Sequence, residues 1–305
     1  MTIDPETICV VTNPGSGRNS KDGAAIDRAM AAFGPKATLR RWRKGDDLDA
    51  FVRQAVEDGF STIVAAGGDG TVMGVAHALM GSDATLGVLP LGTFNYFARG
   101  LGLPQEPEAA ARAILAGQRQ RISVGTVNGQ LFLNNASIGI YPTILQAREG
   151  VYAKWGRSRL AAYWTVLSTI LRFQRPQAIM LTADGERVAV KSPLVFVARS
   201  AYQLERFGLQ GARAISDDQF AVFLVHGGSR WGLMKLALRL ALRRLQQDRD
   251  VDVLYCRDLV IETRKRTPRV AFDGEKMRMR APLRFRIESQ ALNIICPAPQ
   301  DRVKV

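Results

Sequence analysis

The chain has 305 residues, of which 47% are hydrophobic, and it carries a formal net charge of +14 at pH 7. This length and composition exclude a disordered or fibrous protein and suffice for a sizeable core, most simply divided between two domains. So basic a chain is drawn to nucleic acid or to anionic lipid head groups, and composition alone does not choose between them.

The first part of the chain alternates strand and helix patterns, as a parallel α/β sheet does. We expect a helix from Thr71, with Thr71 itself as the N-cap, after an apolar strand. In chain order, the patterns predict strands at 8–12, 38–42, 61–66 and 85–89, and helices at 24–33, 48–57, near 95–101 and at 107–116.

From Ile122 onward the pattern changes to short alternating runs, which predict an antiparallel β domain. A helical insertion is expected from about Lys154 to Phe173. The predicted strands are 122–127, 131–136, 178–182, 194–198, 220–225, 259–263, 269–272 and 283–287. The fold class is therefore α/β, with an N-terminal doubly wound α/β nucleotide-binding domain over 1–121 and an antiparallel β-sandwich domain over 122–305.

The glycine-rich turn Gly67-Gly68-Asp69-Gly70-Thr71 joins a predicted strand to a predicted helix. Its glycines let the backbone adopt positive φ and let N–H groups approach an anion, and the helix dipole adds partial positive charge. Asp69 has no electrostatic reason to lie there unless a cation or a hydroxyl faces it. The alternative is that Asp69 is only a local turn former.

Two further small, glycine-bearing loops follow predicted strands, and a doubly wound sheet binds ligand at the carboxyl ends of its strands. Three such loops in succession predict a site for nucleotide phosphates. The GxxxxGK[ST] and GxGxxG patterns are absent. The residues expected to bind the nucleotide are Asn13, Pro14, Gly15, Ser16, Gly17, Gly67, Gly68, Asp69, Gly70, Thr71, Gly92, Thr93 and Asn95.

These three motifs, the last followed by Phe97-Ala98-Arg99, resemble in order and spacing the nucleotide-binding motifs of the diacylglycerol kinase catalytic-domain family. That family includes bacterial diacylglycerol and phosphatidylglycerol kinases and the sphingosine and ceramide kinases. The resemblance covers essentially the whole chain. It implies an ATP-binding domain, a β-sandwich lipid domain joined to it by a last strand that returns towards it, and Mg²⁺-dependent phosphoryl transfer to a lipid hydroxyl.

Phosphoryl transfer to an alcohol needs a carboxylate that accepts the hydroxyl proton. Asp273-Gly274-Glu275 resembles the catalytic segment of the family, so Asp273 or Glu275 is expected to be the base. On the residues alone this segment is an ordinary hairpin turn, and we interpret a second copy, Asp184-Gly185-Glu186, as such a turn.

Metal ligands are also implied by the resemblance. Asp69 is expected to organise Mg²⁺ near the phosphates, and a structural Mg²⁺ site is implied near Asp217 and Asp218, which are otherwise only a loop. The family commonly has further carboxylates where this chain has Met73-Gly74, Tyr96 and Ser123. We interpret these departures as a subfamily with another metal arrangement; weak metal affinity and an inactive binder are the alternatives.

Lys235, Arg239 and Arg243 recur every four residues in the otherwise apolar segment 231–245. A basic stripe on an apolar helix is typical of a helix at a membrane interface, although a core-facing helix with a solvated basic edge has the same pattern. The sequence does not show aromatic residues interleaved with basic ones, as proteins that bind single-stranded nucleic acid do. We therefore expect no nucleic-acid partner.

Cysteine, histidine and hydropathy narrow the class of protein further. The three cysteines lack CxxC spacing, which fits a reducing cytosol without disulfide or zinc, and two histidines argue against Ser-His-Asp chemistry. The longest apolar candidate, 160–171, is shorter than the ~20 residues of a membrane span, and no signal peptide is recognised. We expect a cytoplasmic protein at the inner face of the membrane.

The leading hypothesis is an ATP-dependent lipid kinase with Mg²⁺, acting on a diacylglycerol-like acceptor at an anionic membrane surface. A small-molecule kinase of the NAD-kinase type and a non-catalytic nucleotide or lipid binder are the alternatives. The identity of the acceptor lipid and the oligomeric state stay open.

Overall fold

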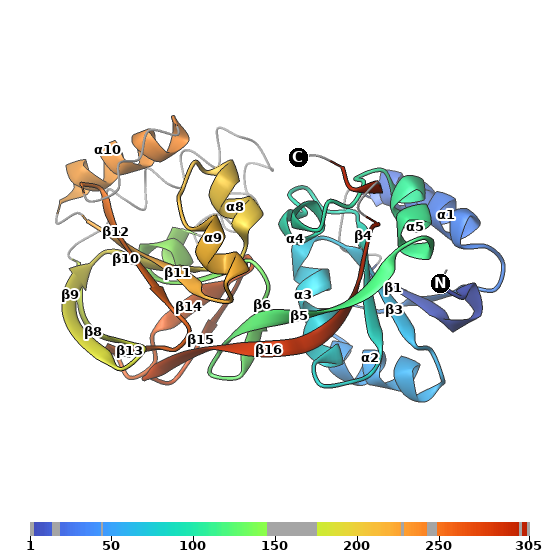
Figure 1. The fold of residues 1–305 in the computed structure, drawn as a ribbon, viewed down its shortest axis with the longest axis horizontal. Coiled ribbons are helices and arrows are strands. Elements are labelled where there is room, and N and C mark those ends of the chain that lie inside the picture. The colour runs from blue at the N-terminus through green and yellow to red at the C-terminus, as the bar shows by residue number, and fades with distance from the viewer. Residues whose placement is uncertain are drawn as a thin grey trace. The chain divides into compact units, whose positions relative to one another are not determined.

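The computed structural model describes residues 3–13, 19–43, 45–144, 176–226, 229–242, 249–298 and 301–303. The chain divides into two compact units, Met1–Val124 with Glu288–Val305, and Gly125–Ile287 (Figure 1). Two strands, β5 (Gln118–Val127) and β16 (Leu283–Cys296), contribute residues to both units. The predicted boundary near Arg121 falls inside β5, and the predicted helical insertion lies outside the described residues.

The first unit is built on a parallel sheet of order β2-β1-β3-β4, and the last part of β16 pairs in parallel with β4. The strands β1, β3 and β4 are buried along their whole length, as expected when a parallel sheet is covered on both faces, whereas the edge strand β2 is partly exposed. Besides β16, the strands are β1 (Ile8–Thr12), β2 (Thr38–Arg41), β3 (Thr62–Gly67) and β4 (Thr85–Pro90).

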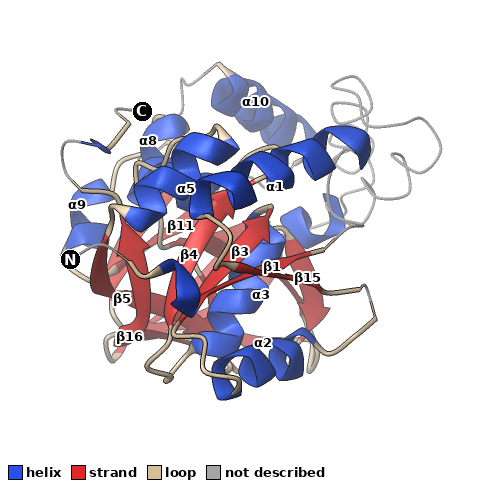
Figure 2. Cartoon of the chain, turned by 90° about the vertical axis from the view of Figure 1, so that its right-hand side faces the viewer, coloured by secondary structure: helices blue, strands red, loops and turns tan. Residues whose placement is uncertain are grey.

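Helices cover both faces of this sheet. Figure 2 shows α1 (Asn19–Phe33) and α5 (Pro107–Leu115) over one face, and α2 (Leu48–Glu57) and α3 (Asp69–Leu79) over the other. Phe33 and Ile114 pack with Val10, Val64 and Leu89 in a buried core cluster. The short elements are the 3₁₀ turn Pro5–Thr7 and α4 (Tyr96–Gly100).

The second unit contains a six-stranded antiparallel sheet of order β12-β11-β10-β7-β14-β15. Its strands are β7 (Asn135–Gly139), β10 (Leu194–Ala198), β11 (Phe220–Val225), β12 (Val251–Cys256), β14 (Arg269–Phe272) and β15 (Glu275–Arg278). The other strands of the unit are β6 (Gln130–Phe132), β8 (Gln177–Ala183), β9 (Glu186–Ser192) and β13 (Leu259–Thr263), with parts of β5 and β16. The rings of Phe132, Phe220 and Phe285, whose centroids are 5.8–6.5 Å apart, join the two sets of strands in one core.

The described part of this unit also contains the helices α8 (Ala201–Arg206), α9 (Ala212–Ser216) and α10 (Arg230–Ala241), and residues 140–144 are helical. None of the described helices of the chain is long and apolar enough to cross a membrane.

The predicted fold class, a parallel α/β domain followed by an antiparallel β domain, is confirmed. Two local predictions are wrong. Helix α3 begins at Asp69 with Gly68 as its N-cap, because extended Gly68 accepts the Val72 N–H, so Thr71 is not the cap. The predicted strand 131–136 is two strands, β6 and β7, separated by Leu133 and Asn134.

Candidate functional site

The carboxyl ends of β1, β3 and β4 lie side by side. Thr12 pairs with Ala66, and Gly67 pairs with Pro90, so the residues after the three strands share one edge of the sheet. The structure therefore brings together Asn13, Gly67–Thr71 and Gly92–Asn95 from the predicted nucleotide site. Pro14, Gly15, Ser16 and Gly17 lie outside the described residues.

The glycines at this edge allow close approach of one loop to another. A Cβ on Gly92 would lie 2.5 Å from the Gly68 Cα, and one on Gly67 would lie 2.6 Å from the Thr71 Oγ1. Neither separation is sterically possible without a shift. Gly67, Gly68 and Gly70 lack positive φ, so the expectation that the glycines of this turn supply left-handed backbone is wrong.

The Asn95 side chain stabilises the third loop by hydrogen bonds to the backbone of the same loop. That side chain is buried, its Oδ1 accepts the Gly92 N–H at 2.9 Å, and its Nδ2 donates to the Gly92 carbonyl and to Gln105 Oε1, each at 3.1 Å. Asn95 has φ of 50°, a left-handed conformation that asparagine tolerates better than most residues. These bonds hold the loop closed over 92–95.

Asp69 connects the second and third loops. Its Oδ1 accepts the Phe97 N–H at 3.3 Å, at the start of α4. Burial raises the pKa of the Asp69 carboxyl, and the N–H groups of Phe97, Asn95 and Tyr96 oppose that rise. The carboxylate thus has backbone partners that the sequence analysis did not foresee.

Asp69 also fits the chemistry of Mg²⁺. Kinase sites hold this ion with one or two carboxylates together with the phosphates of the nucleotide, and a cation would favour the ionised form of a buried carboxyl. No cluster of three or more His, Cys, Asp or Glu side chains suited to a metal occurs within the described ranges, so a bound nucleotide would have to supply further oxygens.

Asp273 occupies the turn between β14 and β15 and is 9% exposed. Its Oδ2 accepts the Leu133 N–H at 2.6 Å, and its Oδ1 accepts the N–H groups of Asn134 and Asn135 at 2.8 and 3.0 Å. Both oxygens therefore bind the segment between β6 and β7. This arrangement makes Asp273 an anchor of the hairpin.

The second Asp-Gly-Glu copy has the same local geometry. Asp184 and Asp273 have φ of 45° and 46°, and each is followed by a glycine with φ near 90°. The Asp184 carboxylate accepts the N–H groups of Arg257 at 3.0 Å and Asp258 at 2.8 Å. In both hairpins the aspartate ties the turn to a neighbouring loop.

Glu275 differs from Asp273 because its side chain is exposed at the start of β15. Within the described ranges it forms no hydrogen bond or ion pair, which leaves its carboxylate able to accept a proton from a substrate. Of the two predicted catalytic residues, Glu275 has the accessible carboxylate.

Asp273→Asn should lower the free energy of unfolding by about 2–3 kcal/mol, because an amide cannot accept all three buried N–H groups. Urea denaturation measures this change. Asp184→Asn is the matched control, and its free energy of unfolding should fall by less, because the hairpin that contains Asp184 is exposed. Equal losses in the two variants would contradict the anchoring role of Asp273.

The Asp217-Asp218 pair is surrounded by guanidinium groups. Arg199 Nη2 donates to Asp218 Oδ1 at 2.5 Å, and its Nη1 donates to the Ile215 carbonyl at 2.8 Å. Arg213 Nε lies 3.8 Å from Asp217 Oδ2. Guanidinium groups already face these carboxylate oxygens. Asp217 and Asp218 therefore do not fit the structural Mg²⁺ site that the resemblance implies.

The positions where family carboxylates are replaced have other contacts. Met73 is buried in α3, the Tyr96 ring stacks on Phe94 with centroids 5.5 Å apart, and Ser123 Oγ accepts the Gln290 N–H at 3.3 Å. Phe94, within the third loop, is 53% exposed and gives an aromatic surface that the sequence analysis did not single out.

Family models match the two parts of the chain in succession. The model described as the diacylglycerol kinase catalytic domain matches residues 7–127, and the one described as the YegS C-terminal NAD kinase beta sandwich-like domain matches residues 146–296. Together they span most of the sequence, and the chain belongs to the diacylglycerol kinase catalytic-domain family.

Individual relatives agree with this assignment. A "probable lipid kinase YegS-like" protein of Pseudomonas aeruginosa (strain UCBPP-PA14) is 41% identical over 139 residues, 45% of each chain. A diacylglycerol kinase of Bacillus subtilis (strain 168) is 37% identical over 135 residues, 43% of this chain and 45% of its own. These matches span less than half of each relative.

The fold is shared with solved structures over nearly the whole length. A crystal structure of a diacylglycerol kinase from Bacillus anthracis str. Sterne superposes with a TM-score of 0.69 at 22% identity, covering 97% of this chain and 98% of that one. At this identity the likeness concerns the fold alone.

Proposed function

We propose that the protein is an ATP-dependent lipid kinase that transfers the γ-phosphate of ATP to the hydroxyl of a diacylglycerol-like lipid. The observation that carries the proposal is the meeting of Asn13, the turn 67–71 and the loop 92–95 at one sheet edge, within the part matched by the catalytic-domain model. The relatives named as lipid kinases support a lipid as the acceptor.

The first unit would bind the nucleotide. Backbone N–H groups of the loops at 13–17, 67–71 and 92–95, with the N-terminus of α3, would hold the phosphates. Asp69 would hold Mg²⁺, and the bound ion would supply positive charge beside the β- and γ-phosphates.

The second unit would supply the proton acceptor. The lipid oxygen forms a bond to the γ-phosphorus, the bond from that phosphorus to the β,γ-bridging oxygen breaks, and ADP leaves. Glu275 takes the hydroxyl proton, and Asp273 positions Glu275 by anchoring the hairpin. Two carboxylates separated by a single glycine thus have different roles.

A kinase for a small soluble acceptor is the second candidate, because the model matching the C-terminal part is described as NAD kinase sandwich-like. Incubation with ATP and Mg²⁺ and either diacylglycerol vesicles or NAD separates the candidates. We expect phosphorylated diacylglycerol and no phosphorylated NAD. ATP binding without turnover of either acceptor would instead indicate a non-catalytic binder, as the replaced carboxylates at 73–74, 96 and 123 allow.

We further propose that α10 docks the protein on the inner face of an anionic membrane. Trp231, Leu238 and Leu242, at spacings of seven and four residues, are 71%, 61% and 55% exposed. They share one helix face with exposed Lys235, an arrangement typical of an interfacial helix. The predicted basic stripe is interrupted, because Arg239 is ion-paired with buried Asp250, and Arg243 lies outside the described residues.

Trp231→Ser with Leu238→Ser should weaken binding to vesicles containing phosphatidylglycerol by about tenfold or more, since buried apolar area supplies much of the affinity of such helices. Vesicle sedimentation at low and high salt measures the change, and high salt should weaken the wild type as well. Val188→Ser, at another exposed apolar site, is the control. Unchanged binding of the double variant would rule out docking through α10.

A further inference from the structure

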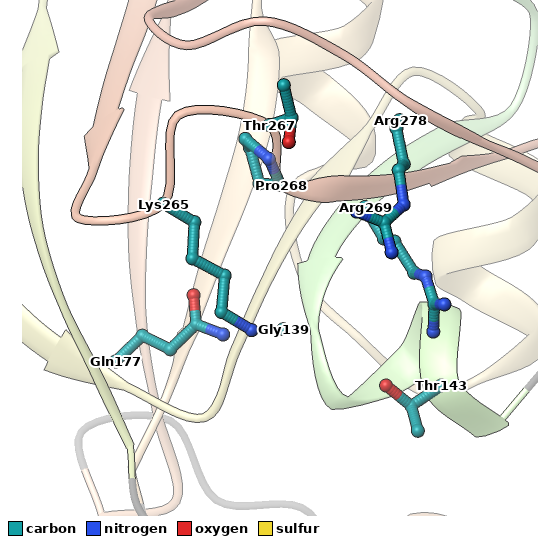
Figure 3. A pocket seen from close by; sticks show the side chains of 8 residues that line it. All are labelled: Gly139, Thr143, Gln177, Lys265, Thr267, Pro268, Arg269 and Arg278. Carbon is teal, nitrogen blue, oxygen red and sulfur yellow. The ribbon is translucent and has the colours of Figure 1, made fainter.

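A basic pocket lies within the second unit, apart from the proposed catalytic hairpin turn. It has a volume of about 280 Å³ and is lined by Gly139, Thr143, Gln177, Lys265, Thr267, Pro268, Arg269 and Arg278 (Figure 3). Arg278 lies three residues along β15 from Glu275, which corresponds to about 10 Å of strand. The pocket is therefore at the other end of the β14–β15 hairpin.

Of the eight described residues that line the pocket, three are cationic and none is acidic. Arg269 and Arg278 are direct partners in the antiparallel β14–β15 pair, so their side chains leave the same face. Lys265 adds a third positive charge. An anion bound between these side chains would be attracted by all three cations.

The remaining polar lining residues can donate hydrogen bonds. Figure 3 shows Lys265 and Gln177 on one side of the pocket and Arg269 and Arg278 on the other, with Thr143 below the arginines. Hydroxyl and amide donors beside guanidinium groups suit the oxygens of a tetrahedral anion, and arginine binds such oxygens through two parallel hydrogen bonds.

Gly139 keeps one wall of the pocket free of a side chain. It has φ of 105°, and a Cβ there would lie 2.2 Å from the Pro193 carbonyl oxygen, so no other residue fits. The volume is just below the ~300–1,000 Å³ of pockets that enclose a drug-sized ligand, which favours a small group over a whole nucleotide.

We propose that this pocket binds a phosphate group, either the head group of an anionic phospholipid or free inorganic phosphate. The proposal does not depend on kinase activity, because it concerns a binding site on strands and loops of the second unit alone.

The test is binding by Arg269→Gln/Arg278→Gln compared with the wild type. Titration calorimetry with inorganic phosphate and sedimentation with phosphatidylglycerol or phosphatidylcholine vesicles are the two arms. Because each positive charge near an anionic surface contributes on the order of 1 kcal/mol, the double variant should bind its ligand about tenfold or more weakly. Lys265→Gln should weaken binding about fivefold. Because Lys265 lies in a loop, this variant tests the pocket without changing the β14–β15 hairpin.

Arg206→Gln/Arg213→Gln is the matched control, since it removes two charges from exposed positions on α8 and α9. Weaker binding by the pocket variants alone supports the proposal. If the weakening appears with inorganic phosphate, the ligand is free phosphate; if it appears with phosphatidylglycerol vesicles, the ligand is the lipid head group. Binding of the wild type to neither probe, or equal losses in the pocket and control variants, would overturn it.

Discussion

Glu275→Gln should lower the rate of phosphoryl transfer to lipid by about 10²–10⁴-fold, the usual contribution of a general base. The Glu275 side chain is exposed and makes no hydrogen bond or ion pair in the described part of the chain, so its amide variant should keep the wild-type free energy of unfolding within about 0.5 kcal/mol. The rate is measured with saturating ATP and Mg²⁺, and stability by urea denaturation.

Glu186→Gln is the matched control, because Glu186 holds the same position in the other Asp-Gly-Glu hairpin. It should leave both rate and stability unchanged. Asp273→Asn, by contrast, should lower stability together with rate. If Glu275→Gln retained full activity while Asp273→Asn lost it without loss of stability, Asp273 would be the base.

Arg199→Ala should lower the free energy of unfolding by about 2–3 kcal/mol. The Arg199 side chain is 7% exposed and pairs with Asp218, so its removal leaves the Ile215 carbonyl without this donor and the carboxylate without its cation. Breaking a fully buried pair costs about 3–5 kcal/mol, and the expected loss is smaller because Asp218 is 41% exposed.

Arg213→Ala is the control for Arg199, since Arg213 is 96% exposed and faces the adjacent Asp217. The free energy of unfolding of Arg213→Ala should fall by less than about 0.5 kcal/mol.

Without nucleotide, added Mg²⁺ or a chelator should leave the unfolding midpoint of the wild type unchanged. A clear stabilisation by Mg²⁺ that Asp218→Asn abolishes would show that these carboxylates hold a metal after all.

The fold could be predicted because its signals are local. Apolar strands that end in glycine-bearing loops predict a parallel sheet. The strand predictions at Ile8–Thr12 and Phe220–Val225 agree with the structure residue for residue. The division of 131–136 into β6 and β7 could not be predicted, because the N–H groups of that segment bind Asp273, which is 138–140 residues away.

The sequence predicted that the turn 67–71 and the loop 92–95 lie at one sheet edge, but it did not predict the contacts that hold them there. Asp69 was identified from the turn around it, yet its backbone partner Phe97 is 28 residues away. Arg199 follows an ordinary strand, and only the fold brings it to Asp218.

Transfer of labelled γ-phosphate from ATP, in the presence of Mg²⁺, into a total bacterial lipid extract is the most direct test of lipid kinase activity. We expect a labelled lipid with the wild type and with Glu186→Gln, little with Glu275→Gln, and a mobility that identifies the class of acceptor. No labelled lipid from a folded wild type that binds ATP would contradict the assignment of lipid kinase activity.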